Sequence, residues 1–202
     1  MQEILSVVIV LIFSVIIHEL AHGYSAEFLG DPTPRLQGRL TVNPIKHLDF
    51  FGSILLPGLL FFLNSPLLFG YAKPIQYNPY NILYRRWGPA IVAFAGPLSN
   101  ILLVGLFTLM LYFSTQLGFG PSLQYICHIG ILINLVLAFF NLIPIPPLDG
   151  HYILFSLLPS SADYIRDILR RYSWVFLIIF ILFLWKSFFI LVNLIYTTLV
   201  GI

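Results

Sequence analysis

Charged residues are scarce in this chain of 202 residues. Asp, Glu, Lys and Arg together make up 9% of it, whereas a soluble domain carries about a quarter. Hydrophobic residues make up 59%, and the mean hydropathy is +0.94. These values exclude an ordinary soluble domain and predict an integral membrane protein. The only cysteine, Cys127, lies in an apolar run, so it excludes an internal disulfide or a cysteine-rich metal site and fits a small buried hydrophobe.

Loops long enough to form a second folded unit are also absent, so residues 1–202 are expected to form a single membrane-embedded domain. Four apolar stretches reach the ~20 residues that a helix needs to cross a bilayer. They are 4–28, 87–113, 123–158 with a break at 144–147, and 173–200. The sequence therefore predicts an all-α membrane protein, a helical bundle of about four spanning helices.

Two shorter pieces complete the predicted fold. The apolar stretch 50–63 is too short to span and contains Gly52, Pro57 and Gly58, so it is expected to be re-entrant. Residues 66–80 alternate loosely and are broken by Pro74 and Pro79, which favours a short extended or hairpin piece at the edge of a sheet.

The loop at 114–122 contains no charged residue. The placement of charges in the loops indicates which side of the membrane each loop faces. If 50–63 enters and leaves on one side, nine basic loop residues share one side of the membrane. Positive residues favour the cytoplasm, so both termini are expected outside. The nine are Arg35, Arg39, Lys46, Lys73, Arg85, Arg86, Arg166, Arg170 and Arg171.

The first apolar stretch contains the motif His18-Glu19-Leu20-Ala21-His22. On a helix, His-Glu-x-x-His places two imidazoles at i and i+4, where both can bind one zinc ion and the Glu lies beside it as a general base. Ionisable groups inside a membrane span are costly and mark functional sites. The motif predicts a zinc hydrolase with its active site below the membrane surface.

A catalytic zinc usually takes three protein ligands, and few acids or histidines could supply the third. Asp149 stands out because it follows a proline-rich break, and non-helical backbone at membrane depth is tolerated only where it is buried or lines a cavity. With 50–63 re-entrant, Asp149 also reaches the depth of His22. The other candidates are Glu27, Asp31, His47, Asp49, His128 and His151.

The chain resembles the site-2 protease family of intramembrane zinc metalloproteases. The resemblance rests on residues 18–22, on Gly96-Pro97-Leu98-Ser99-Asn100 and on the run from Asn141 to Gly150, while residues 38–49 resemble the small prokaryotic branch without a PDZ domain. It implies that His18, His22 and Asp149 bind Zn²⁺ and that Glu19 is the general base on a zinc-bound water. It also implies hydrolysis of membrane-spanning substrates near the cytoplasmic side of the inner membrane of a prokaryotic cell.

Four further residues have two interpretations each. Asn141 and Asn100 could form hydrogen bonds between helices or could steady the substrate backbone or the oxyanion. His47 could form an interfacial pair with Asp49 or orient the site. His151, two residues beyond Asp149, could orient the site or have no role in it.

A metal transporter or metal-binding membrane protein that uses the same His and Asp residues is the alternative function. Transporters often contain internal repeats, and none is apparent here. The expected partners are single-span membrane protein substrates and the lipid bilayer, without nucleic acid. The sequence does not determine the oligomeric state.

Overall fold

The computed structural model describes residues 2–47 and 74–201, and every regular element in these ranges is helical. Four helical segments are long and apolar enough to cross a membrane: Glu3–Phe28, Gly88–Gln116, Pro121–Asn141 and Ser173–Val200. This confirms the prediction of an all-α integral membrane protein with four membrane-capable helices. The re-entrant segment expected at 50–63 lies outside the described residues.

The described ranges contain seven helices of seven or more residues and several single turns. The long helices are α1 (Gln2–Phe28), α4 (Gly88–Gln116) and α5 (Pro121–Asn141). The shorter ones are α6 (Gly150–Leu157), α7 (Asp163–Arg171), α8 (Ser173–Ile179) and α9 (Trp185–Val200). Single turns occur at α2 (Thr33–Leu36), Pro44–Lys46 and Ser160–Ala162.

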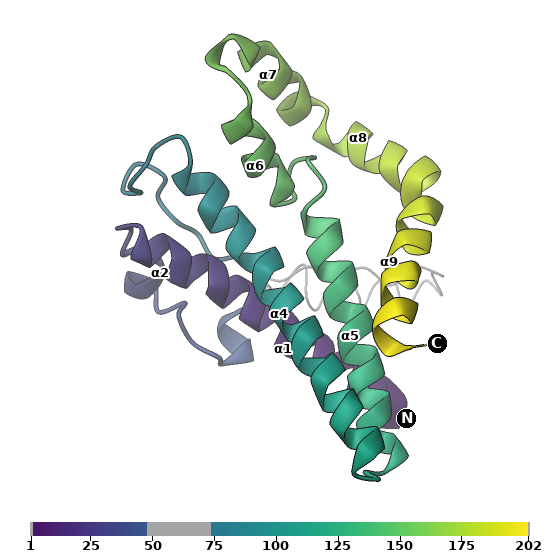
Figure 1. The fold of residues 1–202 in the computed structure, drawn as a ribbon. Helices are drawn as coiled ribbons and strands as arrows, with labels where there is room; N and C mark the ends of the chain where they lie inside the picture. The colour runs from purple at the N-terminus through teal and green to yellow at the C-terminus, as the bar shows by residue number, and fades with distance from the viewer. Residues whose placement is uncertain (1, 48–73, 202) are drawn as a thin grey trace, which may run out of the picture.

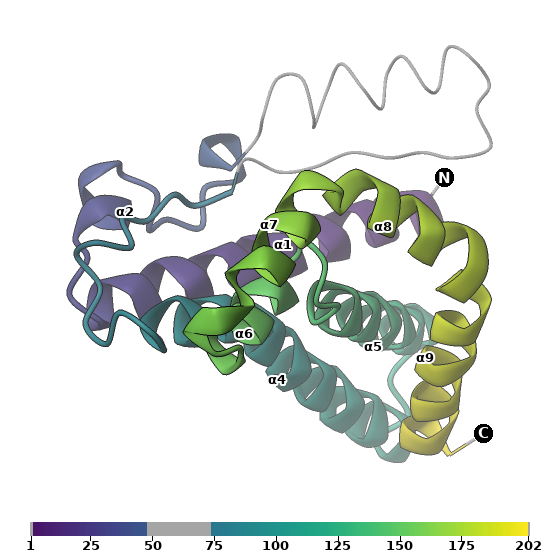
Figure 2. The same cartoon turned by 90° about the horizontal axis from the view of Figure 1, so that it is seen from above.

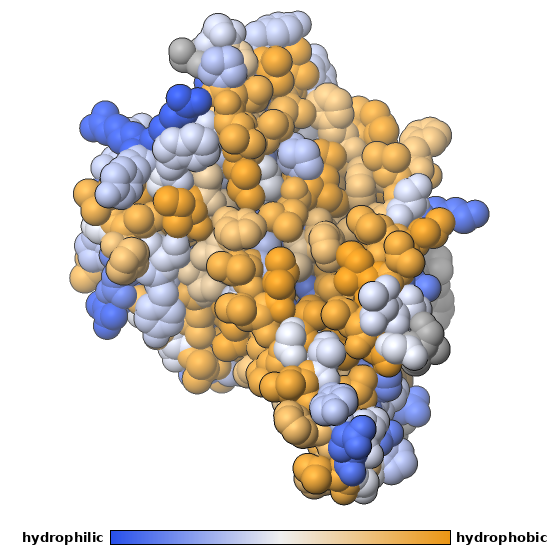
Figure 3. Space-filling model, in the orientation of Figure 1, coloured by the Kyte–Doolittle hydropathy of each residue, from blue (hydrophilic) through white to orange (hydrophobic). Residues whose placement is uncertain are grey.

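Helix α4 packs against α1, α5 and α6, helix α1 also contacts α5, and α9 packs against α5 (Figures 1 and 2). Residues three or four apart on a helix share a face. Leu103, Phe107 and Leu111 of α4 accordingly meet Cys127 and Ile131 of α5 in the main core. The outer surface is apolar over most of the face in Figure 3, which fits contact with lipid.

The last membrane-capable segment is not one straight helix. A π-helical turn at Phe180–Leu184 separates α8 from α9, and the two run in clearly different directions in Figure 2. Single π-helical turns are a recognised cause of helix kinks, so the bend has a local origin.

The proline-rich break is wider than the expected 144–147. Helix α5 ends at Asn141 and α6 begins at Gly150, so residues 142–149 are non-helical. Pro144, Pro146 and Pro147 lack the N–H that a helix requires, and the residue before a proline is pushed out of helical geometry as well. The break carries Asp149 to the first turn of α6.

Of the extended or hairpin piece expected at 66–80, residues 66–73 lie outside the described part of the chain. Residues 74–80 form no strand. The backbone N–H groups of Ile75 and Asn78 donate to the side chains of Glu19 and Asp31 instead of to a neighbouring strand. Since Pro74 and Pro79 have no N–H, a continuous ladder is not available to this segment.

Candidate metal site

His18 and His22 lie one turn apart on the same face of α1. Their Nε2 atoms are 3.0 Å apart, and their rings meet edge to face with centroids 4.6 Å apart. Both residues are buried, at 6% and 9% exposure. The i and i+4 spacing therefore brings two imidazole nitrogens to one point inside the bundle.

Asp149 reaches the same point from the break after α5. Its Oδ2 lies 3.1 Å from His18 Nε2 and 3.3 Å from His22 Nε2. The following residue must be glycine here, because a Cβ at Gly150 would lie 2.2 Å from the carbonyl oxygen of Leu142. The backbone at Gly150 thus packs directly against Leu142, and this close packing places the Asp149 carboxylate beside the two histidines. All three ligand atoms lie within 4.8 Å of one another.

Each imidazole is oriented by a hydrogen bond from its other ring nitrogen. His22 Nδ1 lies 2.7 Å from the carbonyl oxygen of Val92 on α4, and a carbonyl only accepts, so Nδ1 carries the proton. The Nε2 atom of His22 then presents a lone pair toward Asp149. This pairing of a ring N–H with a backbone carbonyl is typical of histidines that bind metals.

His18 is oriented by a chain of amides that crosses three helices. Asn134 of α5 donates to the carbonyl oxygen of Gly130 at 2.8 Å, which fixes its amide orientation. Its Oδ1 therefore accepts from Asn100 Nδ2 at 2.8 Å, and Asn100 Oδ1 accepts from His18 Nδ1 at 2.6 Å. The proton of His18 is on Nδ1, so its Nε2 also presents a lone pair. Ser14 completes the chain by accepting from Asn134 at 2.9 Å.

The donor set fits a zinc ion. Two imidazole lone pairs and a carboxylate converge, and none of these three groups carries an N–H or O–H at the point where they meet. The three electron-rich atoms repel one another unless a cation or a proton lies between them. Ligands at the usual zinc bond lengths and tetrahedral angle are about 3.3 Å apart, and the separations here are 3.0, 3.1 and 3.3 Å. Two histidines and one carboxylate are also a common ligand set of catalytic zinc.

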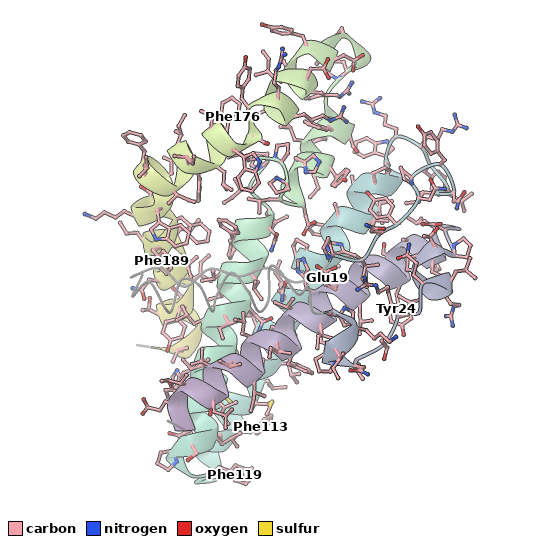
Figure 4. All side chains as sticks on the ribbon, turned by 180° about the vertical axis from the view of Figure 1, so that it is seen from behind. Glu19, Tyr24, Phe113, Phe119, Phe176 and Phe189 are labelled. Carbon is pink, nitrogen blue, oxygen red and sulfur yellow. The ribbon has the colours of Figure 1, made fainter. Side chains whose placement is uncertain are left out.

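Glu19 lies on α1 between the two histidines in sequence and is half-buried. Figure 4 shows it where α1 passes α4. Its Oε2 accepts a hydrogen bond from the backbone N–H of Ile75 at 2.8 Å. A carboxylate held beside a metal site can accept a proton from water, which is the role of a general base.

The other predicted residues differ in how close the structure brings them to this site. Asn100 holds His18, as described above. Asn141 donates to the carbonyl oxygen of Leu137 on its own helix at 2.9 Å. His151 is buried, and its Nδ1 lies 2.6 Å from the carbonyl oxygen of Leu148.

His47 is buried, and its Nε2 lies 2.7 Å from the carbonyl oxygen of Thr41 in its own loop. Its expected partner Asp49 lies outside the described residues. For His47, Asn141 and His151, no hydrogen bond to His18, His22 or Asp149 is present among the described residues.

Sequence reasoning missed four contributors to the site. Asn134 and Ser14 had a detectable signal, since each is a polar residue inside an apolar span and Ser14 precedes His18 by one turn. Val92 and Ile75 contribute backbone groups, which leave no signature in the residue type.

Gly96 of α4 is required by the two imidazoles. A Cβ at this position would lie 2.5 Å from His22 Nε2 and 2.6 Å from His18 Cε1. We expect Gly96→Ala to displace the imidazoles, lower the zinc content and cost about 1–3 kcal/mol of stability through overpacking. Metal analysis and thermal unfolding of the purified protein measure both effects.

Gly105 provides a matched control on the same helix. Nothing lies within 4 Å of a Cβ placed there. Gly105→Ala should keep the zinc content and stabilise the protein slightly, because alanine favours the helix by about 1 kcal/mol. Equal zinc content in the two variants would contradict the proposed role of Gly96.

The comparisons with known proteins agree with this geometry. The model of peptidase family M50 matches residues 120–184. "Putative zinc metalloprotease YwhC" of Bacillus subtilis is 41% identical over 181 residues, which cover 86% of this chain and 79% of that protein. The chain therefore belongs to peptidase family M50, which confirms the resemblance to the site-2 proteases. No solved structure matches the chain.

Two further relatives are also named as zinc metalloproteases. "Putative zinc metalloprotease Rip2" of Mycolicibacterium smegmatis is 29% identical over 179 residues, 85% of this chain and 63% of that protein. "Putative zinc metalloprotease MJ0611" of Methanocaldococcus jannaschii is 47% identical over 64 residues, 31% of each chain.

Proposed function

We propose that this protein is an intramembrane zinc metalloprotease that hydrolyses peptide bonds of membrane-spanning proteins. The observation that carries the proposal is the convergence of His18, His22 and Asp149 among helices that can span a membrane. We assign these three residues as the zinc ligands and Glu19 as the general base. The zinc metalloprotease names of the relatives support the assignment.

Bound zinc supplies a Lewis acid that polarises a peptide carbonyl and lowers the pKa of water toward ~7. Glu19 accepts the proton of the attacking water and passes it to the leaving amine. Val92 and Asn100 keep the two imidazoles in the tautomer whose Nε2 lone pairs face the ion. The chain's own residues thus orient the ligands and move the proton.

The contacts at one end of the bundle support a site near the cytoplasmic side. The N–H of Leu83 donates to the carbonyl oxygen of Leu29 at 2.8 Å, and Arg86 donates to the carbonyl oxygen of Ser156 at 3.0 Å. These bonds join the end of α1, the loop before α4 and the end of α6. All three regions adjoin basic clusters, which favour the cytoplasm.

A substrate must present an unwound or extended segment to this site. Peptide bonds in a spanning helix have their N–H and C=O groups paired within the helix. We therefore infer that the substrates are single-span proteins whose helices unwind near the cytoplasmic surface.

Metal removal tests the proposed function. The purified protein, assayed against a panel of single-span peptides, should cleave at least one of them. A zinc chelator should abolish the cleavage, and added Zn²⁺ should restore it while Mg²⁺ should not, because the His and Asp ligand set suits zinc and Mg²⁺ prefers all-oxygen sites.

A His18→Ala/His22→Ala preparation controls for contaminating proteases and should be inactive under every condition. Cleavage that persists in the chelator, or in the double variant, would contradict the proposal.

A further inference from the structure

Asp31 is a fully buried carboxylate just beyond the end of α1, at 0% exposure. Its Oδ1 accepts from the N–H and the hydroxyl of Thr33, at 3.1 and 2.6 Å, and from Asn81 Nδ2 at 2.9 Å. Its Oδ2 accepts from the N–H of Asn78 at 2.6 Å. Burial opposes ionisation, but these hydrogen bonds outweigh it and hold the pKa of Asp31 below its usual value.

The hydrogen bonds to Asp31 have two different roles. The bonds from Thr33 close the local turn after α1. The bonds from Asn78 and Asn81 come from a segment more than forty residues away in sequence and hold it against the end of α1. Because a buried charge must be fully hydrogen-bonded to be tolerated, the carboxylate fixes the position of this segment strongly.

The other end of the same segment reaches Glu19. The N–H of Ile75 donates to Glu19 Oε2, and the buried side chain of Ile75 lies over Gly23, one turn further along α1. A Cβ at Gly23 would lie 3.2 Å from Ile75 Cδ1, so the bare backbone of the glycine allows this approach. Within the described residues, the hydrogen bond of Glu19 is made by Oε2 and none is made by Oε1.

We propose that Asp31 is a positioning residue for peptide hydrolysis, acting through residues 75–78. It anchors Asn78, and the short connection to Ile75 then holds the Ile75 N–H against Glu19. This bond fixes one oxygen of the base, Oε2, and we assign the other, Oε1, to the proton transfer. The inference rests on the proposed role of Glu19 as general base. Preorganised supporting contacts of this kind commonly change activity by 10–100-fold when removed.

Asp31→Asn tests the proposal selectively. The amide oxygen should stay with the three donors from Thr33 and Asn81, which turns the NH₂ group toward the N–H of Asn78. Two donors then face each other, and the Asn78 anchor is lost while the turn remains. We expect kcat to fall about tenfold, with the KM for the peptide and the zinc content unchanged. Glu27→Gln, at a half-buried carboxylate paired with the exposed Arg35, is the matched control and should keep the wild-type kcat.

Ile75→Pro removes the N–H that reaches Glu19, and combining the two changes tests whether they act together. If Asp31 acts through this N–H, the double variant should be no slower than Ile75→Pro alone. Fully additive losses, an unchanged kcat in Asp31→Asn, or a parallel loss of zinc would each overturn the proposal.

Amide hydrogen exchange gives a readout that needs no catalysis. In Asp31→Asn, residues 75–78 should exchange faster, while α4 should keep the wild-type protection. Unchanged exchange at 75–78 would overturn the proposal whatever reaction the protein catalyses. Faster exchange together with normal cleavage by Glu19→Gln would support the anchor but contradict the proposed function, so the two failures are distinguishable.

Discussion

Replacing Glu19 by Gln is expected to abolish peptide hydrolysis while the protein still binds about one zinc ion per chain. The amide keeps the size of the side chain, and its oxygen can still accept the N–H of Ile75, so the packing is preserved. It cannot accept a proton from water. Loss of a general base lowers rates by about 10²–10⁴-fold, which should bring cleavage to background in a peptide assay.

The measurement combines metal analysis and cleavage rate on one preparation. Glu27→Gln removes another carboxylate from the same helix, two turns beyond Glu19, and should leave both quantities unchanged. Its ion pair with Arg35 is exposed and contributes little. Cleavage by Glu19→Gln within a few-fold of the wild-type rate would mean that Glu19 is not the base.

Asp149→Ala is expected to lower both zinc content and activity. It removes one of three ligand atoms and leaves two imidazole lone pairs 3.0 Å apart without the neighbouring negative charge. The loss of zinc affinity should exceed the 10–100-fold typical of residues that only support a ligand. Metal titration with a competing chelator measures the affinity, and the peptide assay measures the activity.

His128→Ala is the control for this experiment. Its Nδ1 lies 2.8 Å from the hydroxyl of Tyr196, where α5 faces α9, and its described contacts do not include the metal site. This variant should keep its zinc and its activity. Retention of zinc by Asp149→Ala, with loss of zinc from His128→Ala, would show that the third ligand is assigned wrongly.

The convergence of the candidate ligands was predictable from the sequence to the extent that it depends on local geometry. Two histidines at i and i+4 in a helix share a face whatever surrounds them. The assignment of Asp149 needs a longer argument, from a proline-rich break and from the order of the helices, because no local rule joins residues 131 positions apart. In the structure, Gly150 and the break bring its Oδ2 within 3.3 Å of both imidazoles.

The supporting hydrogen bonds were less predictable. For Asn100 the sequence allows either contact with substrate or hydrogen bonds between helices, and its observed partners are His18 and Asn134. Asn141 had the same two interpretations, and it donates within its own helix. An intramembrane amide signals that a partner exists, but the identity of the partner depends on the rotation of each helix about its axis.

The sequence by itself determined the membrane class, the four apolar spans and the shared face of His18 and His22. Each of these follows from composition, from the length of an apolar run or from the 3.6-residue period of one helix. Only the tertiary structure decided which carbonyl holds His22, which amides hold His18, and that the N–H of Ile75 meets Glu19. Backbone groups are the same in every residue except proline, so their partners depend on how the helices and loops pack.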